Sequence, residues 1–137
     1  MSRLYEAQQT LDRAADTLEE SVYNLNGGFT IATVNRAYYA IFYCLTALLH
    51  TEAVYTKRHS GAQGKFHELF IRTNRFPVET NQWVQTVFQL RQAGDYDLEA
   101  DITDEQAKQA LDYARRFYDL TQTYISGQIN APSSAAS

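Results

Sequence analysis

Apolar residues recur every three or four positions over most of the chain. From Leu4 to Leu25 this spacing predicts an amphipathic helix of about six turns. The sequence NGG at 26–28 ends it, because glycine readily takes the left-handed conformation found after helix ends. A second helix is predicted from about Thr30 to Ala53. Its residues also favour a strand, but its length without a turn signal decides for a helix. The predicted buried stripe consists of Val34, Tyr38, Ile41, Leu45 and Leu48.

Shorter elements follow in the second half of the chain. The sequence KRHSGAQG at 57–64 predicts a loop, with Ser60 as the N-cap of a short helix. NRFP at 74–77 ends that helix, and AGDYDLEAD at 93–101 predicts a loop after a fourth helix. Thr103 and Gln106 predict a capping box at the start of the last helix. The short and fourth helices are expected to bury Phe66, Leu69, Phe70, Trp83, Val84, Val87, Phe88 and Leu90. The buried stripe of the last helix is expected to be Ala107, Ala110, Leu111, Ala114, Phe117 and Tyr124.

This order of elements predicts an all-α fold. Short connections favour antiparallel neighbours, so we expect an up-and-down bundle of four main helices plus a short helix. Residues 1–126 form a single domain in this interpretation, and 127–137 form a small, polar C-terminal tail. The two prolines and six glycines of the 137 residues agree with long regular elements.

Composition and charge narrow the class of protein further. No apolar run is long enough for a membrane span, and no signal peptide is apparent. A single cysteine, Cys44, cannot form an internal disulfide, so we expect a cytoplasmic protein. Net charge is −4, yet residues 54–78 hold five Lys or Arg and one Glu, whereas 95–105 hold six acids. Each run is either a solvated surface or a site for phosphate and for a basic partner, respectively.

Two arginines stand in apolar surroundings. Seven residues bring a helix back to nearly the same direction, so Arg36, Tyr43 and His50 share a stripe away from the buried one. Arg36 either pairs with a surface carboxylate or binds a ligand. Arg91 follows Val87 by four residues and therefore needs a partner, for which Asp95 is nearest.

The segment RQAGDYD at 91–97 has two interpretations. Arg91, Asp95 and Tyr96 form either a structural clamp that fixes the following loop or the remnant of a catalytic motif. An arginine on an apolar helix face favours the clamp, since an unpaired buried charge is costly.

Three segments in this order resemble the HEPN domain, in its branch of small stand-alone prokaryotic proteins: NRAYYAIFYCLTALL, KRHSG and RQAGDYD. The resemblance covers roughly Leu4 to Tyr124. It implies a compact helical bundle that forms a homodimer and is often paired with a minimal nucleotidyltransferase as toxin and antitoxin. It also implies metal-independent ribonuclease activity in many members, with about four to six residues between an arginine and a histidine that lie at a cleft between protomers.

The chain departs from that motif. Tyr43 stands where a histidine would follow Arg36, and Tyr96 where one would follow Arg91. Tyrosine, with a reference pKa near 10, does not transfer protons readily near neutral pH as histidine does. His59 or, failing that, His50 could replace the missing group if the fold brings it close. The candidate catalytic residues are Arg36, Tyr43 and His59, and the candidate binding residues are Asn35, Tyr39, Lys57 and Arg58.

Other chemistries find less support. The three histidines and the cysteine lack metal-ligand spacing, and GAQGK at 61–65 lacks the pattern of a phosphate-binding loop, so we expect no metal and no cofactor. Two functions remain open. One is a toxin-like HEPN protein that acts on RNA through a dimer cleft. The other is a non-catalytic module that binds a nucleotide or RNA, or pairs with a nucleotidyltransferase.

Overall fold

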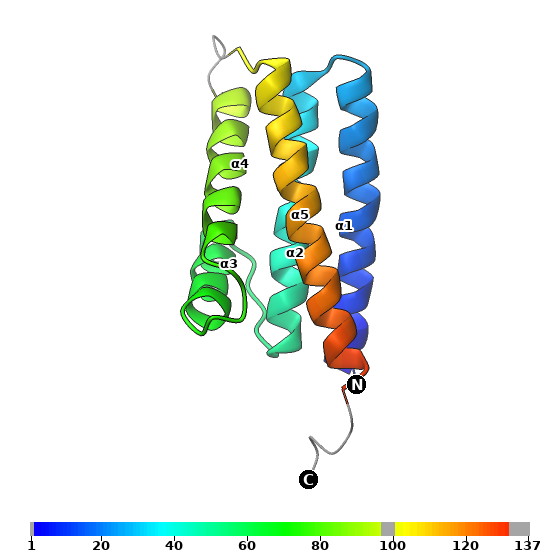
Figure 1. Cartoon of the computed structure of the whole chain (residues 1–137), viewed down its shortest axis with the longest axis vertical. Coiled ribbons are helices and arrows are strands. Elements are labelled where there is room, and N and C mark those ends of the chain that lie inside the picture. Colours follow the sequence, from blue (N-terminus) through cyan, green and yellow to red (C-terminus); the bar gives the residue numbers. More distant parts are fainter. Residues whose placement is uncertain (1, 97–100, 132–137) are drawn as a thin grey trace.

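The computed structural model describes residues 2–96 and 101–131, and every regular element within these ranges is helical (Figure 1). The all-α prediction of four main helices plus a short one is therefore confirmed. The elements are α1 (Ser2–Asn26), α2 (Thr30–Thr51), α3 (His59–Phe66), a π-helical turn η1 (His67–Ile71), α4 (Glu79–Tyr96) and α5 (Asp104–Ile129). None of the helices in the described ranges is long and apolar enough to cross a membrane.

The four long helices run up and down the bundle, and α3 packs beside one end of α4 (Figure 1). Helix α2 contacts α1, α3, α4 and α5, which makes it the central helix. Its high apolar content follows from this position, because a helix surrounded by others is buried on most sides. The predicted stripe of α2 is confirmed, since each member exposes at most 2% of its surface: Val34, Tyr38, Ile41, Leu45 and Leu48.

Both ends of α2 are set by left-handed residues. Gly28, with φ of +82°, turns the chain between α1 and α2 as the sequence NGG predicted. At the other end the helix stops at Thr51 rather than at Ala53. Ala53 has a φ of +56°, and the amide of Val54 donates to the carbonyl of Leu49, which closes the helix earlier than the apolar pattern suggested.

Helix α3 corrects the predicted loop at 57–64. It begins at His59, with Arg58 rather than Ser60 at the N-cap. Arg58 is extended, with ψ of 136°, and its carbonyl accepts from the amide of Ala62 at 2.9 Å. The two glycines at 61 and 64 therefore lie within a helix and do not break it. Phe66 and Phe70 are buried as predicted, whereas Leu69 is only half-buried.

Helix α4 continues to Tyr96, so the loop predicted from Ala93 is wrong for residues 93–96. Gly94 has a packing role there: a Cβ at this position would lie 3.4 Å from the Ile31 side chain and 3.6 Å from that of Ile102. The glycine thus permits close approach of two segments and is not a turn signal. Residues 97–100 of the predicted loop lie outside the described residues.

The start of α5 matches its prediction. The amide of Gln106 donates to Thr103 Oγ1 at 3.1 Å, and the amide of Thr103 donates to Gln106 Oε1 at 3.0 Å. This reciprocal pair is the predicted capping box. Tyr124 is half-buried, whereas the other predicted stripe residues are buried: Ala107, Ala110, Leu111, Ala114 and Phe117. The helix extends to Ile129, past the predicted start of the tail at 127.

Candidate functional site

The most densely connected polar cluster lies where the start of α3 meets α2 and α4. His59, the first residue of α3, packs its ring against three α2 rings, with centroid distances of 4.0 Å to Phe42, 5.4 Å to Tyr38 and 5.8 Å to Tyr39. The hydroxyl of Tyr38 lies 2.5 Å from His59 Nδ1. The imidazole is therefore oriented by a hydrogen bond with Tyr38, a residue fixed in the core.

Arg91 reaches the same two tyrosines from α4. Its guanidinium carbon lies 4.8 Å from the ring centroid of Tyr38 and 5.7 Å from that of Tyr39, and Nη2 lies 3.5 Å from the Tyr39 hydroxyl. Nε is 2.9 Å from Asp95 Oδ2, one turn further along the helix. Arg91 and Asp95 thus form the ion pair of the predicted clamp, while the side chain of Tyr96 lies outside the described residues. His59 and Arg91, from α3 and α4, both lie against the same pair of rings.

The electrostatic setting of His59 favours the neutral imidazole. Burial lowers the pKa of His59 below its ordinary value, and the positive charge of Arg91 lowers it further. A neutral imidazole carries one proton, on either nitrogen. When Nδ1–H donates to the Tyr38 hydroxyl oxygen, Nε2 keeps its lone pair and can accept a proton.

Arg36 of α2 also contacts the ring of Tyr39, against which His59 packs. Its guanidinium carbon is 5.1 Å from the centroid of Tyr39. Nε and Nη2 donate to Asn35 Oδ1 at 3.2 and 2.8 Å, and Nη1 pairs with Glu20 of α1 at 3.3 Å. Asn35 Nδ2 in turn donates to Asp95 Oδ2 at 3.5 Å. A chain of polar contacts therefore connects the two arginines.

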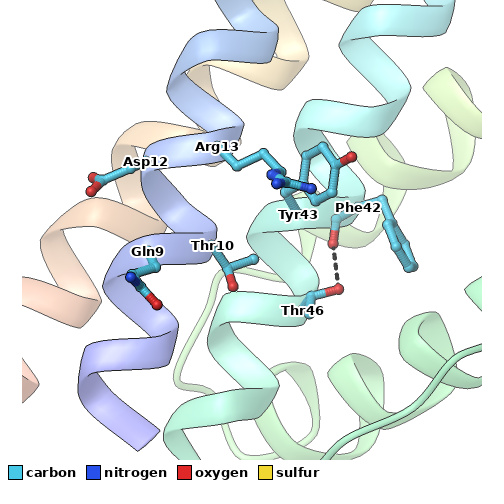
Figure 2. A pocket seen from close by; sticks show the side chains of 7 residues that line it. All are labelled: Gln9, Thr10, Asp12, Arg13, Phe42, Tyr43 and Thr46. Carbon is cyan, nitrogen blue, oxygen red and sulfur yellow. Dashed lines mark hydrogen bonds between the residues drawn. The ribbon is translucent and has the colours of Figure 1, made fainter. Parts of the chain in front are cut away.

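Tyr43 faces a different part of the molecule. Figure 2 shows its ring beside Arg13 of α1, whose guanidinium carbon lies 5.7 Å from the ring centroid. The two side chains belong to a groove of about 640 Å³ between α1 and α2, lined by Gln9, Thr10, Asp12, Arg13, Phe42, Tyr43 and Thr46. Tyr43 is joined to the first cluster through Tyr39, at 6.4 Å, and through Phe42, at 6.2 Å. Within the described residues it makes no ring contact with His59.

The remaining candidates are Lys57 and Arg58, which are next to His59 in the chain, and His50, which lies away from it. Lys57 and Arg58 are exposed and directly precede His59 in the chain. His50 lies further along α2, where its ring packs 4.9 Å from that of Tyr55. Eight residue steps along α2 separate His50 from Phe42, the nearest α2 residue of the cluster, or about 12 Å along the axis, so His50 does not join the cluster.

Sequence reasoning missed two members of this network. Tyr38 was assigned to the core, which is correct for its ring, but its hydroxyl also holds His59. Glu20, the partner of Arg36, comes from α1 and follows no motif. A signal for Tyr38 existed in the chemistry, because a buried tyrosine hydroxyl usually has a hydrogen-bond partner. The partner itself could not be read from the pattern.

The arrangement can bind an anion and accept a proton. Two guanidinium groups and a neutral imidazole surround the half-buried ring of Tyr39. Among residues 2–96 and 101–131, no three His, Cys, Asp or Glu side chains are grouped so that they could hold a metal ion.

Comparison with known proteins agrees with the all-α bundle. The model of the HEPN domain family matches residues 7–124, and the chain therefore belongs to the HEPN domain family. It is 34% identical over 120 residues to a Methanocaldococcus jannaschii protein named "Putative toxin MJ0142", covering 88% of this chain and 82% of the relative. A "UPF0332 protein" of Thermotoga maritima is 29% identical, covering 82% of this chain and 86% of the relative. One from Gloeobacter violaceus is 26% identical, covering 88% and 96%.

Proposed function

We propose that this HEPN protein is the toxin-type member of a toxin–antitoxin pair and cleaves RNA without a metal. One observation supports the proposal: Arg91 and His59, from different helices, both lie against the ring of Tyr38, although no motif in the sequence links them. The relative named as a toxin supports the toxin assignment. The lack of a histidine at the motif interval after Arg91 is therefore a weaker argument against catalysis.

The chemistry assigned to His59 is proton transfer. In the proposed step, His59 Nε2 takes the proton of a ribose 2′-hydroxyl, and the oxygen forms a bond to the adjacent phosphorus. The bond from phosphorus to the 5′ oxygen breaks, and the imidazolium returns its proton to that leaving oxygen. The products are a 2′,3′-cyclic phosphate and a 5′-hydroxyl. The pKa of His59, lowered by burial and by Arg91, keeps the base unprotonated before the step.

Arg36 is the proposed phosphate ligand. Its side chain exposes 34% of its surface, and its partner Glu20 exposes 57%, so their ion pair can exchange for a phosphate at small cost. A guanidinium binds phosphate through two parallel hydrogen bonds. Tyr39 and Asn35 support this group, and Lys57 and Arg58 add positive charge near His59. Tyr43 has no part in proton transfer in this proposal.

A second candidate is a non-catalytic module that binds RNA or a nucleotide, or pairs with a nucleotidyltransferase antitoxin. It is favoured by the pairing of both arginines, Arg91 with Asp95 and Arg36 with Glu20. In this alternative the network fixes the bundle, and His59 is a packed residue at the start of α3.

We also propose a homodimer. Tyr39 and Tyr43 are half-buried and covered by arginines, so they supply little apolar surface for a dimer. Large exposed aromatic side chains lie instead at Tyr23 and Phe29, near the turn between α1 and α2. Exposed apolar surface of this kind is typical of an interface. Sedimentation over a dilution series tests this part of the proposal.

Cleavage of a 5′-labelled single-stranded RNA in the presence of EDTA tests the main proposal. We expect cleavage by the parent and a loss of about 100-fold or more in His59→Asn, the usual effect of removing a general base. His50→Asn is the matched control and should cleave like the parent. Binding without cleavage would favour the second candidate, and equal cleavage by parent and His59→Asn would exclude His59 as the base.

A further inference from the structure

A second concave surface adjoins the cluster on the side of α3 and α4. It is a groove of about 350 Å³ whose lining includes Gln63, Gly64, His67, Asn81, Gln85 and Phe88. Gln63 follows His59 by one helical turn, so the groove begins where the proposed base lies. On α4, the ring of Phe88 lies 5.7 Å from that of Tyr38, which holds His59.

The side chains that line this groove carry amides, a hydroxyl and two rings, but no carboxylate, ammonium or guanidinium group. Gln85 Nε2 donates to Gln63 Oε1 at 3.2 Å, which joins α4 to α3 across the groove. This bond leaves the Gln63 amide nitrogen and the Gln85 amide oxygen available to a ligand. The same holds if the oxygen and nitrogen of both amides are exchanged. The amide of Asn81 adds a further donor and acceptor. Such a surface suits a neutral planar ligand with donors and acceptors on one edge.

We propose that this groove binds an adenine base of the RNA, next to the phosphate that Arg36 binds and at which His59 acts. Asn and Gln amides pair bidentately with adenine, whereas Arg or Lys typically reads guanine, and Asp or Glu accepts from cytosine. None of these charged residues lines the groove. Phe88 and His67 provide ring faces of the kind on which unpaired RNA bases stack. The inference rests on the proposed function and adds a base preference and a requirement for single-stranded RNA.

Gly64 offers a way to block the groove while leaving the bundle intact. A Cβ at Gly64 would meet no heavy atom within 4 Å, so a larger side chain has open space. Gly64 is also within a helix, where replacement of glycine favours helix formation. Gly127 on α5 has the same open surroundings and lies outside the groove. Gly64→Leu therefore has Gly127→Leu as its matched control.

The test is fluorescence anisotropy with two labelled single-stranded RNAs, one of uridine only and one with adenosines at its centre. We expect the parent and Gly127→Leu to prefer the adenosine RNA about tenfold or more. Gly64→Leu and Gln85→Ala should lose this preference while still binding the uridine RNA. A duplex of the adenosine strand should bind no better than the uridine RNA, because its base edges are paired.

Two outcomes overturn the inference. If the parent binds both single strands equally, or if both groove variants keep the preference, the groove does not read adenine and the proposed function still stands. If the parent binds neither RNA, the proposed function fails and the inference fails with it.

Discussion

Arg36 and Arg91 lie against the same tyrosine ring, at 5.1 and 5.7 Å from the centroid of Tyr39, but their surroundings differ. Arg91 exposes only 13% of its side chain and pairs with Asp95, which exposes 24%. Arg36 exposes 34%, and its partner Glu20 exposes 57%. One guanidinium is held inside the bundle and the other lies at its edge.

On sequence grounds each arginine has either a structural or a functional role. The difference in exposure distinguishes the two. An ion pair at the surface contributes little to stability, because water and salt screen it and both side chains must be ordered. A buried charge costs much more to leave unpaired, so its pair holds the structure. Arg91 is therefore suited to fix α4 and to set the electrostatic environment of His59. Arg36 is suited to exchange Glu20 for a phosphate.

Truncation of the two arginines tests the comparison most strongly. Arg91→Ala leaves Asp95 largely without its partner, and we expect the free energy of unfolding to fall by about 2–3 kcal/mol, between the values for buried and surface pairs. Arg36→Ala should lower it by less than about 1 kcal/mol. Urea denaturation measures both values. Equal effects of the two variants would mean that burial does not distinguish these ion pairs.

The pKa of His59 tests how differently Arg91 and Arg36 act on this imidazole. Burial is the larger cause of the lowered pKa, and Arg91 is the second. In an NMR titration of the imidazole, Arg91→Ala should therefore raise the pKa partly toward about 6.5, the ordinary value. Arg36 is not among the causes, so Arg36→Ala should leave the pKa unchanged. A similar rise in both variants would place Arg36 closer to His59 electrostatically than the structure does.

The lowered pKa also sets a direction for stability against pH. The unfolded chain binds the His59 proton at about pH 6.5, whereas the folded chain binds it only at lower pH. The unfolded state is thus favoured as pH falls through 6.5 toward the folded pKa, and stability is lost in that window. His59→Asn should lose less stability there than the parent. Part of the loss should remain, because burial also lowers the pKa of His50.

The sequence predicted the fold where local chemistry and periodicity agree. The stripe of α2 repeats at helical spacing and is buried throughout, and Thr103 with Gln106 caps α5 through contacts within one turn. The start of α3 could not be predicted in this way. Gly61 and Gly64 are typical loop residues, and packing against α2 stabilises the segment as a helix despite them.

The candidate site was predictable in part. Arg91 and Asp95 are four residues apart, so a helical reading could place them together. His59 and Tyr38 are 21 residues apart with a turn between them, and their contact depends on where α3 packs. A fixed interval between an arginine and a histidine does not identify His59, because His59 and Arg91 come from different helices.

The smallest expected effect concerns Tyr43. Replacement by histidine restores an arginine and a histidine with six residues between them, the spacing that the resemblance implies for catalysis. The structure turns this residue toward Arg13 of α1, in the groove of Figure 2, and not toward His59. A histidine there would lie beside Arg13, outside the cluster that holds the proposed base. We expect Tyr43→His to cleave the labelled RNA at the rate of the parent within about twofold, since no transition-state contact is gained. Tyr43→Phe is the matched control, because it keeps the ring over which Arg13 lies and removes only the hydroxyl. Cleavage increased tenfold in Tyr43→His but not in Tyr43→Phe would show that the reactive phosphate lies over α1 and α2, and would replace His59 by residue 43 as the group that transfers the proton.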